Sequence, residues 1–147
     1  MVHAIIERGI EYQREAFSSI PEGPAEQSGI DQIRILLDFA WDFCTTRSNL
    51  IALWYELSLP SAAEYARQIF SLEEESIQRL KNIISFMTLK PGVDPDAAVY
   101  IIDNVVSGIL KHSLSEVEER KFAAHFGNRD KETVLSSIIA TVSLLFE

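Results

Sequence analysis

Apolar residues recur at intervals of three or four along most of the chain, and proline or glycine interrupts this pattern at a few joints. That interval is typical of amphipathic α-helices, whereas a half-buried strand alternates at every second residue. No segment shows such alternation between turn-forming pairs, so we predict no sheet. The pattern predicts one all-α domain over residues 1–147, a bundle of about six helices. The expected segments are 2–18, 30–45, 48–59, 61–88, 94 to near 112, a short one over 115–127, and 130–147.

Several joints contain residues that start or stop helices. Residues 61–64 read Ser-Ala-Ala-Glu, which is a capping box. Asp94 precedes Pro95, an N-cap followed by proline at the first helical position. Ser115 predicts one more helix start, and Gly127 predicts the end of that short helix.

The segment 30–45 is apolar around nearly its whole circumference. A helix of this kind is buried at the centre of a bundle. Only a narrow strip of it is polar, and this strip contains Asp31, Arg34, Asp38 and Asp42.

The last two long helices present wider apolar surfaces than one subunit needs to bury. No charged residue occurs between Thr133 and Phe146. Burial of apolar area is favourable, so we expect these helices from two subunits to form a four-helix interface about a two-fold axis, giving a homodimer. The alternative is that both helices are central in the monomer. The expected interface residues are Val99, Val106, Leu110, Leu135, Ile139, Ala140, Ser143 and Phe146.

Composition and charge narrow the class of protein. The chain has 147 residues, of which 47% are hydrophobic and 24% charged, as in soluble globular domains. Its net charge of −9 opposes nucleic-acid binding, and its longest uncharged run is shorter than the roughly 20 residues that span a bilayer. The single cysteine, Cys44, excludes an intramolecular disulfide and favours a reduced, cytoplasmic setting.

The order of helices resembles the C-terminal domain of TetR-family transcriptional regulators. Residues 3–12, His-Ala-Ile-Ile-Glu-Arg-Gly-Ile-Glu-Tyr, are similar to the linker helix that follows the family's DNA-binding domain. The apolar helix with Trp41, the short helix ending at Pro60 and the long helix from Ser61 follow the family's order. Residues 94–108 resemble the family's penultimate helix, which commonly contains a glycine near this point. The resemblance covers essentially the whole chain as an arrangement of helices.

The resemblance implies a module of a repressor that dimerises and binds a small apolar or cationic effector in its helical core. In the family, this binding is coupled to the spacing of two DNA-binding heads. The family's N-terminal helix-turn-helix domain is absent from this sequence, and Met1 stands where that domain would join. We therefore expect either a fragment or a naturally short protein, with no direct nucleic-acid contact.

Glu73 falls within the stripe of segment 61–88 where an apolar residue is expected. A buried carboxylate is costly without a partner, so one interpretation is a polar anchor for a cation or a hydrogen-bond donor. The alternative is a position at the rim of the stripe, beside Glu74 and Glu75. Aromatic residues at helical spacing form either pocket walls or ordinary core. Together with Glu73, the expected ligand-binding residues are Trp41, Cys44, Trp54, Tyr55, Phe70, Ile77, Tyr100 and Asn104.

The sequence contains no motif for catalysis or metal binding. His3, His112 and His125 lack the spacing of a metal site, and no Glu-x-x-His, phosphate-binding loop or Gly-x-Ser-x-Gly occurs. We therefore expect no enzyme activity, no metal and no cofactor. Two alternatives to a sensor remain. One is a short helical protein that pairs with a full-length regulator without binding DNA itself. The other is a helical enzyme or carrier unrelated to transcription.

Overall fold

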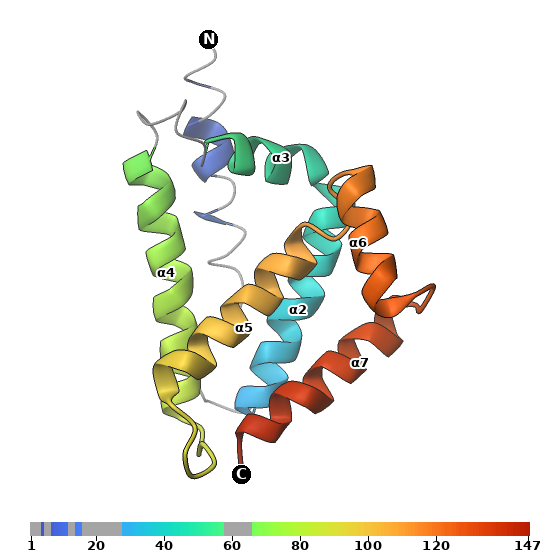
Figure 1. Cartoon of the computed structure of the whole chain (residues 1–147). Coiled ribbons are helices and arrows are strands. Elements are labelled where there is room, and N and C mark those ends of the chain that lie inside the picture. Colours follow the sequence, from blue (N-terminus) through green and yellow to red (C-terminus); the bar gives the residue numbers. More distant parts are fainter. Residues whose placement is uncertain (1–3, 5–6, 12–13, 16–27, 58–65) are drawn as a thin grey trace.

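The computed structural model describes residues 4, 7–11, 14–15, 28–57 and 66–147, and the regular elements within them are helices (Figure 1). This confirms the predicted all-α bundle. Where the structure describes them, the predicted boundaries agree closely with those observed, except at the chain end; the ends of segment 2–18, the end of 48–59 and the start of 61–88 lie outside the described residues. The helices are α2 (Gly29–Thr46), α3 (Ser48–Leu57), α4 (Ala66–Ser85), α5 (Pro95–Leu110), α6 (Glu116–Phe126) and α7 (Lys131–Val142), followed by the 3₁₀ turn η2 (Ser143–Leu145).

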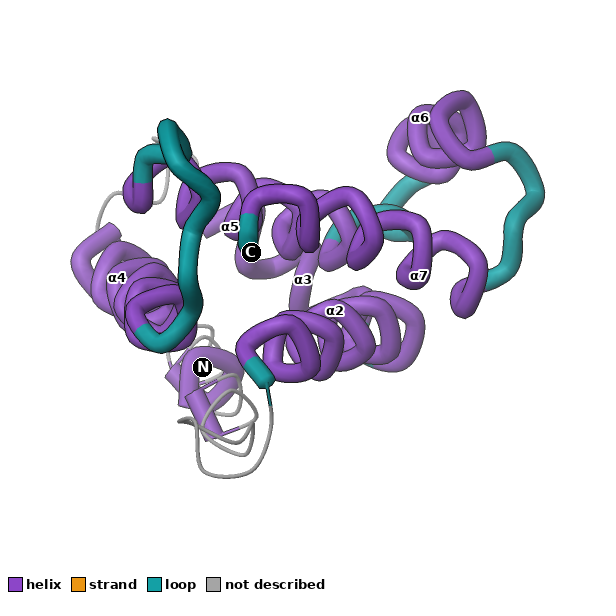
Figure 2. The backbone as a smooth tube through the Cα atoms, turned by 90° about the horizontal axis from the view of Figure 1, so that it is seen from below, coloured by secondary structure: helices purple, strands orange, loops and turns teal. Residues whose placement is uncertain are grey.

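Helix α2 occupies the centre of the fold, as its apolar circumference predicts, and packs against α3, α4, α5 and α7. Figure 2 shows α5 and α7 on one side of α2, with α6 standing out beyond them. Helix α4 lies beside α5 at the opposite end of the molecule from α6 (Figure 1). Two spaces are thereby framed, one between α3, α4 and α5 and the other between α5, α6 and α7.

Side-chain caps fix the start of four helices. The carboxylate of Asp94 accepts from the Ala97 amide at 2.8 Å, and Asp130 caps α7 in the same way. The predicted cap at Ser115 and the stop at Gly127 are confirmed, with Gly127 at a φ of 64°. Ser28 caps α2. The capping box predicted at residues 61–64 lies outside the described residues.

The core forms where α2, α4, α5 and α7 meet. Its members are aliphatic side chains spaced three or four residues apart on each helix, which is why each helix turns one continuous stripe inward. The most completely buried of the described residues include Ile33, Leu37, Cys44, Ile51, Ile102, Val134 and Leu135.

The polar strip of α2 faces the first turn of α7. The Arg34 guanidinium donates to the Glu132 carboxylate at 2.6 Å, and the Lys131 ammonium donates to Asp42 at 2.9 Å. Lys131 also lies 3.3 Å from Asp38. Exposed pairs contribute little energy singly, so their main effect is to set the register of α7 on α2.

The chain end departs from the predicted helix over 130–147. Helix α7 stops at Val142, and the Ser143 hydroxyl donates to the Ile139 carbonyl at 2.7 Å. The last residues then run extended beside the loop after α4, with one β-bridge between Leu89 and Phe146. The Glu147 amide donates to the Thr88 carbonyl at 2.9 Å. These backbone bonds replace those that a continued helix would have made.

Half of the predicted interface residues lie inside the subunit's own core. Val99, Val106, Leu135 and Phe146 are all buried there: the first three face the core from α5 and α7, and Phe146 packs into it from the tail after η2. They are therefore not available to a second subunit, contrary to their expected place on an interface. The remaining four are at least partly accessible: Leu110, Ile139 and Ser143 are half-buried, and Ala140 is exposed.

In the described part of the chain, no helix has both the length and the apolar character needed to cross a membrane.

Candidate functional site

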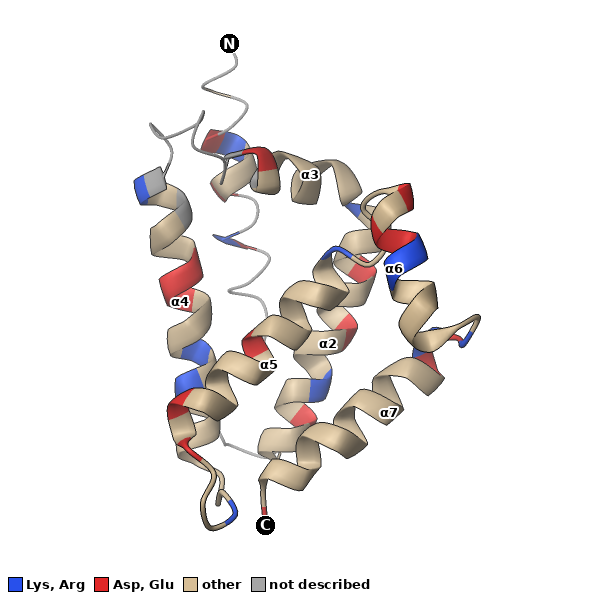
Figure 3. Cartoon of the chain, in the orientation of Figure 1, with Lys and Arg blue, Asp and Glu red and all other residues tan. Residues whose placement is uncertain are grey.

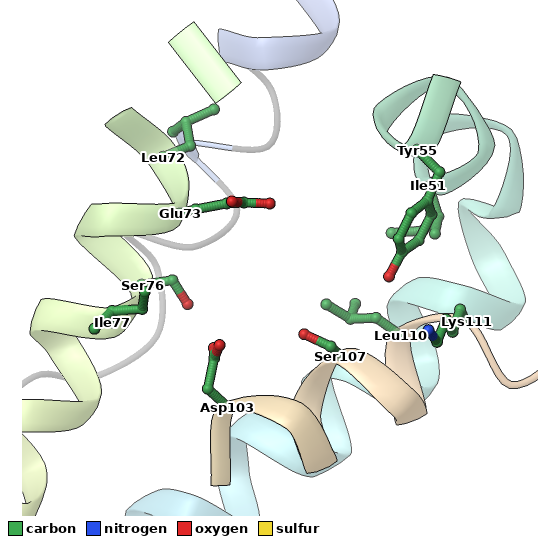
Figure 4. Close-up of a pocket in the computed structure, with 10 residues that line it drawn as sticks. All are labelled: Ile51, Tyr55, Leu72, Glu73, Ser76, Ile77, Asp103, Ser107, Leu110 and Lys111. Carbon is green, nitrogen blue, oxygen red and sulfur yellow. The ribbon is translucent and has the colours of Figure 1, made fainter. Parts of the chain in front are cut away.

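A cavity of about 270 Å³ lies between α3, α4 and α5 (Figure 4). Apolar side chains form part of its wall, and hydroxyl and carboxyl groups form the rest. The lining residues are Ile51 and Tyr55 from α3, Leu72, Glu73, Ser76 and Ile77 from α4, and Asp103, Ser107, Leu110 and Lys111 from α5 and its C-terminal end.

Helical spacing explains why these residues share one space. On α4 the consecutive lining positions are separated by one, three and one residues, and on α5 by four and three, so each set lies on one face. Figure 4 shows the carboxylates of Glu73 and Asp103 and the Tyr55 hydroxyl directed into the space. The hydroxyls of Ser76 and Ser107 also face it (Figure 4). Oxygen atoms from three helices therefore converge on one volume.

The charged groups of the cavity are unequal in number. Glu73 and Asp103 have no ion-pair or hydrogen-bond partner among residues 28–57 and 66–147. Among the described residues of the wall, the only basic one is Lys111, whose Nζ lies 5.8 Å from the centre of the Tyr55 ring. The ammonium therefore sits against the aromatic face at one end. Two carboxylates share the cavity with one ammonium that contacts neither.

The pKa values of the acidic groups in the cavity are raised, as expected where acidic groups outnumber basic ones. Burial raises the pKa of Glu73, and repulsion from Asp103 raises it further. Burial also raises the pKa of Asp103. The pKa of Tyr55 is raised by burial and by repulsion from Glu118 and Glu73. Each group is thus shifted toward its protonated form, which is the response expected where negative charge is poorly solvated and lacks a cation.

Three of the predicted ligand-binding residues, Tyr55, Glu73 and Ile77, meet in this cavity. Glu73 is exposed, as expected for a position at the rim of the stripe. Its carboxylate nevertheless lines the cavity, as expected for a polar anchor. Phe70 and Tyr100 are largely exposed on the outside of α4 and α5.

The other predicted residues lie elsewhere. Trp41 stacks on the ring of His112 with centroids 4.1 Å apart, and Asn104 lines the space between α5, α6 and α7. Cys44 is fully buried, with its sulfur 3.2 Å from the Ser113 hydroxyl. The side chain of Trp54 lies outside the described residues.

Cys44 and His112 form a buried polar pair beneath α5. Burial alone would raise the pKa of the Cys44 thiol, but hydrogen bonds with His112 and Ser113 outweigh it, and the pKa is lowered. For His112, burial is likewise outweighed by hydrogen bonds with Cys44 and the Ile109 carbonyl, which raise its pKa. The Nδ1 of His112 lies 2.6 Å from that carbonyl. The pair satisfies its own polar atoms and lies outside the cavity wall.

Sequence reasoning missed Asp103, Ser107 and Lys111 as cavity residues. Asp103 interrupts the apolar run of its helix, and the sequence alone does not distinguish a cavity-lining acid there from a solvent-facing one. One signal was present: residues 103, 107 and 110 share a helical face, and so do residues 73, 76 and 77. Whether these two faces line the same cavity depends on how α4 packs against α5, and the spacing of residues along one helix does not predict that.

Among the residues that the structure describes, no three of His, Cys, Asp or Glu are grouped as a metal site would require. No family model, no curated protein and no solved structure matches the chain. The chemistry of the cavity is therefore the best guide to function. Its two acids, one aromatic ring and aliphatic wall suit the binding of an organic cation.

Proposed function

We propose that the chain is the effector-sensing and dimerisation module of a TetR-type transcriptional regulator, and that its effector is a small organic cation. The observation that supports the effector site is the convergence of Glu73 and Asp103 on the α3–α4–α5 cavity without a cation partner. The regulator assignment rests on the resemblance in helix order set out above.

A protonated amine suits each wall of the cavity. Its ammonium would lie between the Glu73 and Asp103 carboxylates, where charge-assisted hydrogen bonds are stronger than neutral ones. Its apolar body would contact Ile51, Leu72 and Ile77. The volume of about 270 Å³ is close to the lower end of typical ligand pockets, so the amine is expected to be small.

Binding there can affect the rest of the module through α5. An amine held by Glu73 on α4 and Asp103 on α5 favours the arrangement in which those two helices stand closest. Such a ligand shifts the population of arrangements by its difference in affinity for them. Because α5 also packs on α2, which carries α7, the shift extends to the helix that we propose for dimerisation.

The outer surface of α7 supports dimerisation. Beyond its first turn, α7 carries no charged side chain (Figure 3). Solvent-facing helices normally present charged residues, yet the accessible positions beyond the first turn of α7 are serine, threonine, alanine or isoleucine. Leu144, just after α7, is 66% exposed. An uncharged surface of this kind suits contact with the same surface of a second copy.

The uncharged α7 surface equally suits the alternative that the chain pairs with a full-length regulator and binds no effector. The cavity separates the two proposals. A sensor binds a cationic probe at Glu73 and Asp103, whereas a pure interaction module binds none there.

We expect 2-naphthylmethylamine to bind at least about tenfold more tightly than its neutral isostere 2-naphthalenemethanol, because hydrogen bonds to charged groups are the stronger class. Glu73→Gln and Asp103→Asn should each weaken amine binding roughly tenfold and leave the alcohol unchanged. Since the pKa values of both acids are raised, amine affinity should fall as the pH is lowered from 7 toward 5. Isothermal titration calorimetry measures all three effects.

Glu74→Gln provides the matched control, because Glu74 lies next to Glu73 on α4 but is exposed and outside the cavity wall. Equal affinity for the amine and the alcohol would refute the cation site. So would an equal loss from Glu74→Gln, since it would reflect only the overall negative charge.

Ala140→Glu should convert the dimer to a monomer without unfolding it. Ala140 is exposed on α7, so a glutamate there is tolerated by the subunit but places a charge on the uncharged surface. Sedimentation equilibrium measures the change. Ala124→Glu on α6, which is also exposed, should leave the mass unchanged. A monomeric wild type at high concentration would contradict dimerisation through α7.

A further inference from the structure

A second space in the described part of the chain lies on the other side of α5. It is a groove of about 380 Å³ between α5, α6 and α7, distinct from the α3–α4–α5 cavity. Its walls are mainly apolar, with Val105 and Ile109 from α5, Phe122 and Phe126 from α6, and Ile138 from α7. The volume lies within the range of small-molecule sites.

Helix α6 presents one face to this groove. Its lining residues are at positions 118, 121, 122, 125 and 126, the spacing of a single helical stripe. Phe122 and Phe126 form the aromatic edge of the stripe, with ring centroids 4.9 Å apart. Lys121 and His125, one turn apart, form the polar edge. An aromatic wall thus runs beside a pair of nitrogen groups.

The base of the groove is formed by aromatic rings packed against one another. His112 lines it, with its ring stacked on Trp41 at 4.1 Å and tilted against Phe122 at 5.1 Å. Trp41 also meets Phe122 edge to face at 5.7 Å. Such preorganised aromatic surfaces bind flat apolar bodies at little entropic cost.

The described lining of the groove contains two lysines, Lys111 and Lys121, and one acid, Glu118. Neither Lys121 nor His125 forms an ion pair within the described ranges, 28–57 and 66–147. The one acid of the described lining, Glu118, lies three residues before Lys121, about one turn of the helix, and seven residues before His125, about 10 Å along the helix axis. It lies near enough to Tyr55 to raise the pKa of that phenol. In a chain of net charge −9, the Lys121–His125 end is a local site for an anion.

Gly108 keeps the middle of the groove open. It lies on α5 within the lining, and a Cβ built there would meet no atom within 4 Å. A glycine inside a helix is unfavourable by roughly 1 kcal/mol relative to alanine, so its presence at this position removes bulk from the groove at a cost in stability.

We infer that the α5–α6–α7 groove is a second ligand site, which takes a small aromatic carboxylate with its ring between Phe122, Phe126 and Ile138 and its carboxylate on Lys121 and His125. This inference does not depend on the effector proposed for the α3–α4–α5 cavity. The two sites are expected to select ligands of opposite charge.

Isoleucine methyl NMR of the full chain can observe both sites at once. Ile109 and Ile138 line the groove, whereas Ile51 and Ile77 line the cavity. We expect 2-naphthoate to shift the methyl signals of Ile109 and Ile138 and to leave those of Ile51 and Ile77 in place. Its affinity should exceed that of 2-naphthalenemethanol by at least about tenfold.

Two variants test the ligand contacts. Lys121→Gln should weaken 2-naphthoate roughly tenfold. Arg120→Gln is the matched control, because Arg120 is on the same helix, outside the lining, and pairs with Glu116 at 2.7 Å. Gly108→Leu should fill the groove and abolish binding, while the unfolding transition remains cooperative because the new side chain enters open space.

Three results would overturn the inference. The first is a shift confined to Ile51 and Ile77, which would place the carboxylate in the cavity. The second is an equal loss of affinity in Lys121→Gln and Arg120→Gln, which would leave only a general charge effect. The third is the absence of naphthoate binding together with intermolecular contacts from Ile138 to a second labelled copy, which would assign the groove to subunit association.

Discussion

Leu135→Ala is expected to lower the free energy of unfolding by about 3 kcal/mol, within the range for truncating a fully buried leucine. Leu135 has no exposed surface and packs in the cluster that joins α2, α5 and α7. The loss should be independent of protein concentration, because the cavity opens inside one subunit. Urea denaturation at two concentrations, tenfold apart, measures both quantities.

Leu144→Ala makes the same chemical change at a position that is 66% exposed. It should change the free energy of unfolding of the subunit by less than about 0.5 kcal/mol. If the loss in Leu135→Ala instead became smaller as the protein was diluted, Leu135 would stabilise a dimer rather than a subunit, because association adds less stability at low concentration. The burial of α7 on α2 would then be wrong.

Phe146→Ala should cost about 3–5 kcal/mol, the range for deleting a buried aromatic ring. Phe146 is 5% exposed and belongs to the same core cluster, although it is the penultimate residue of the sequence. Its backbone also pairs with Leu89, so the side chain anchors the chain end against the loop after α4. Thermal unfolding followed by circular dichroism measures the loss.

Phe86→Ala is the control, since Phe86 lies near the same loop but is 66% exposed. It should change the melting temperature little. Amide hydrogen exchange gives a local readout: in Phe146→Ala the Glu147 amide, which donates to Thr88, should lose protection first. Equal melting temperatures for both variants would show that the chain end is not part of the core.

The helices could be predicted from sequence because their signals are local. A cap or stop residue affects only the helix end beside it. The structure confirms the helix start predicted at Asp94 and Pro95, and the start and end predicted at Ser115 and Gly127. The C-terminal end could not be predicted this way. Val142 is followed by no proline or glycine, and the helix stops there as the tail pairs with residues 88–90, far away in the sequence.

The sequence also could not predict which side of α7 is buried in the subunit. Its sequence is uncharged all round, so periodicity alone did not separate the side that faces α2 from the side that faces outward. Leu135 was therefore placed with Ala140 on one predicted interface, whereas the first is buried and the second exposed. Similarly, Glu73 could be singled out as an acid in an apolar stripe, but its neighbour Asp103 comes from another helix.

Lys111 lies in the walls of both the cavity and the groove, with its ammonium above the Tyr55 ring. A molecule in either space that displaces this residue changes the lining of the other. Thermodynamic linkage then requires each ligand to alter the affinity of its counterpart by the same factor. With an amine on one side and a carboxylate on the other, the domain would respond to the joint presence of two metabolite classes, as a coincidence detector does.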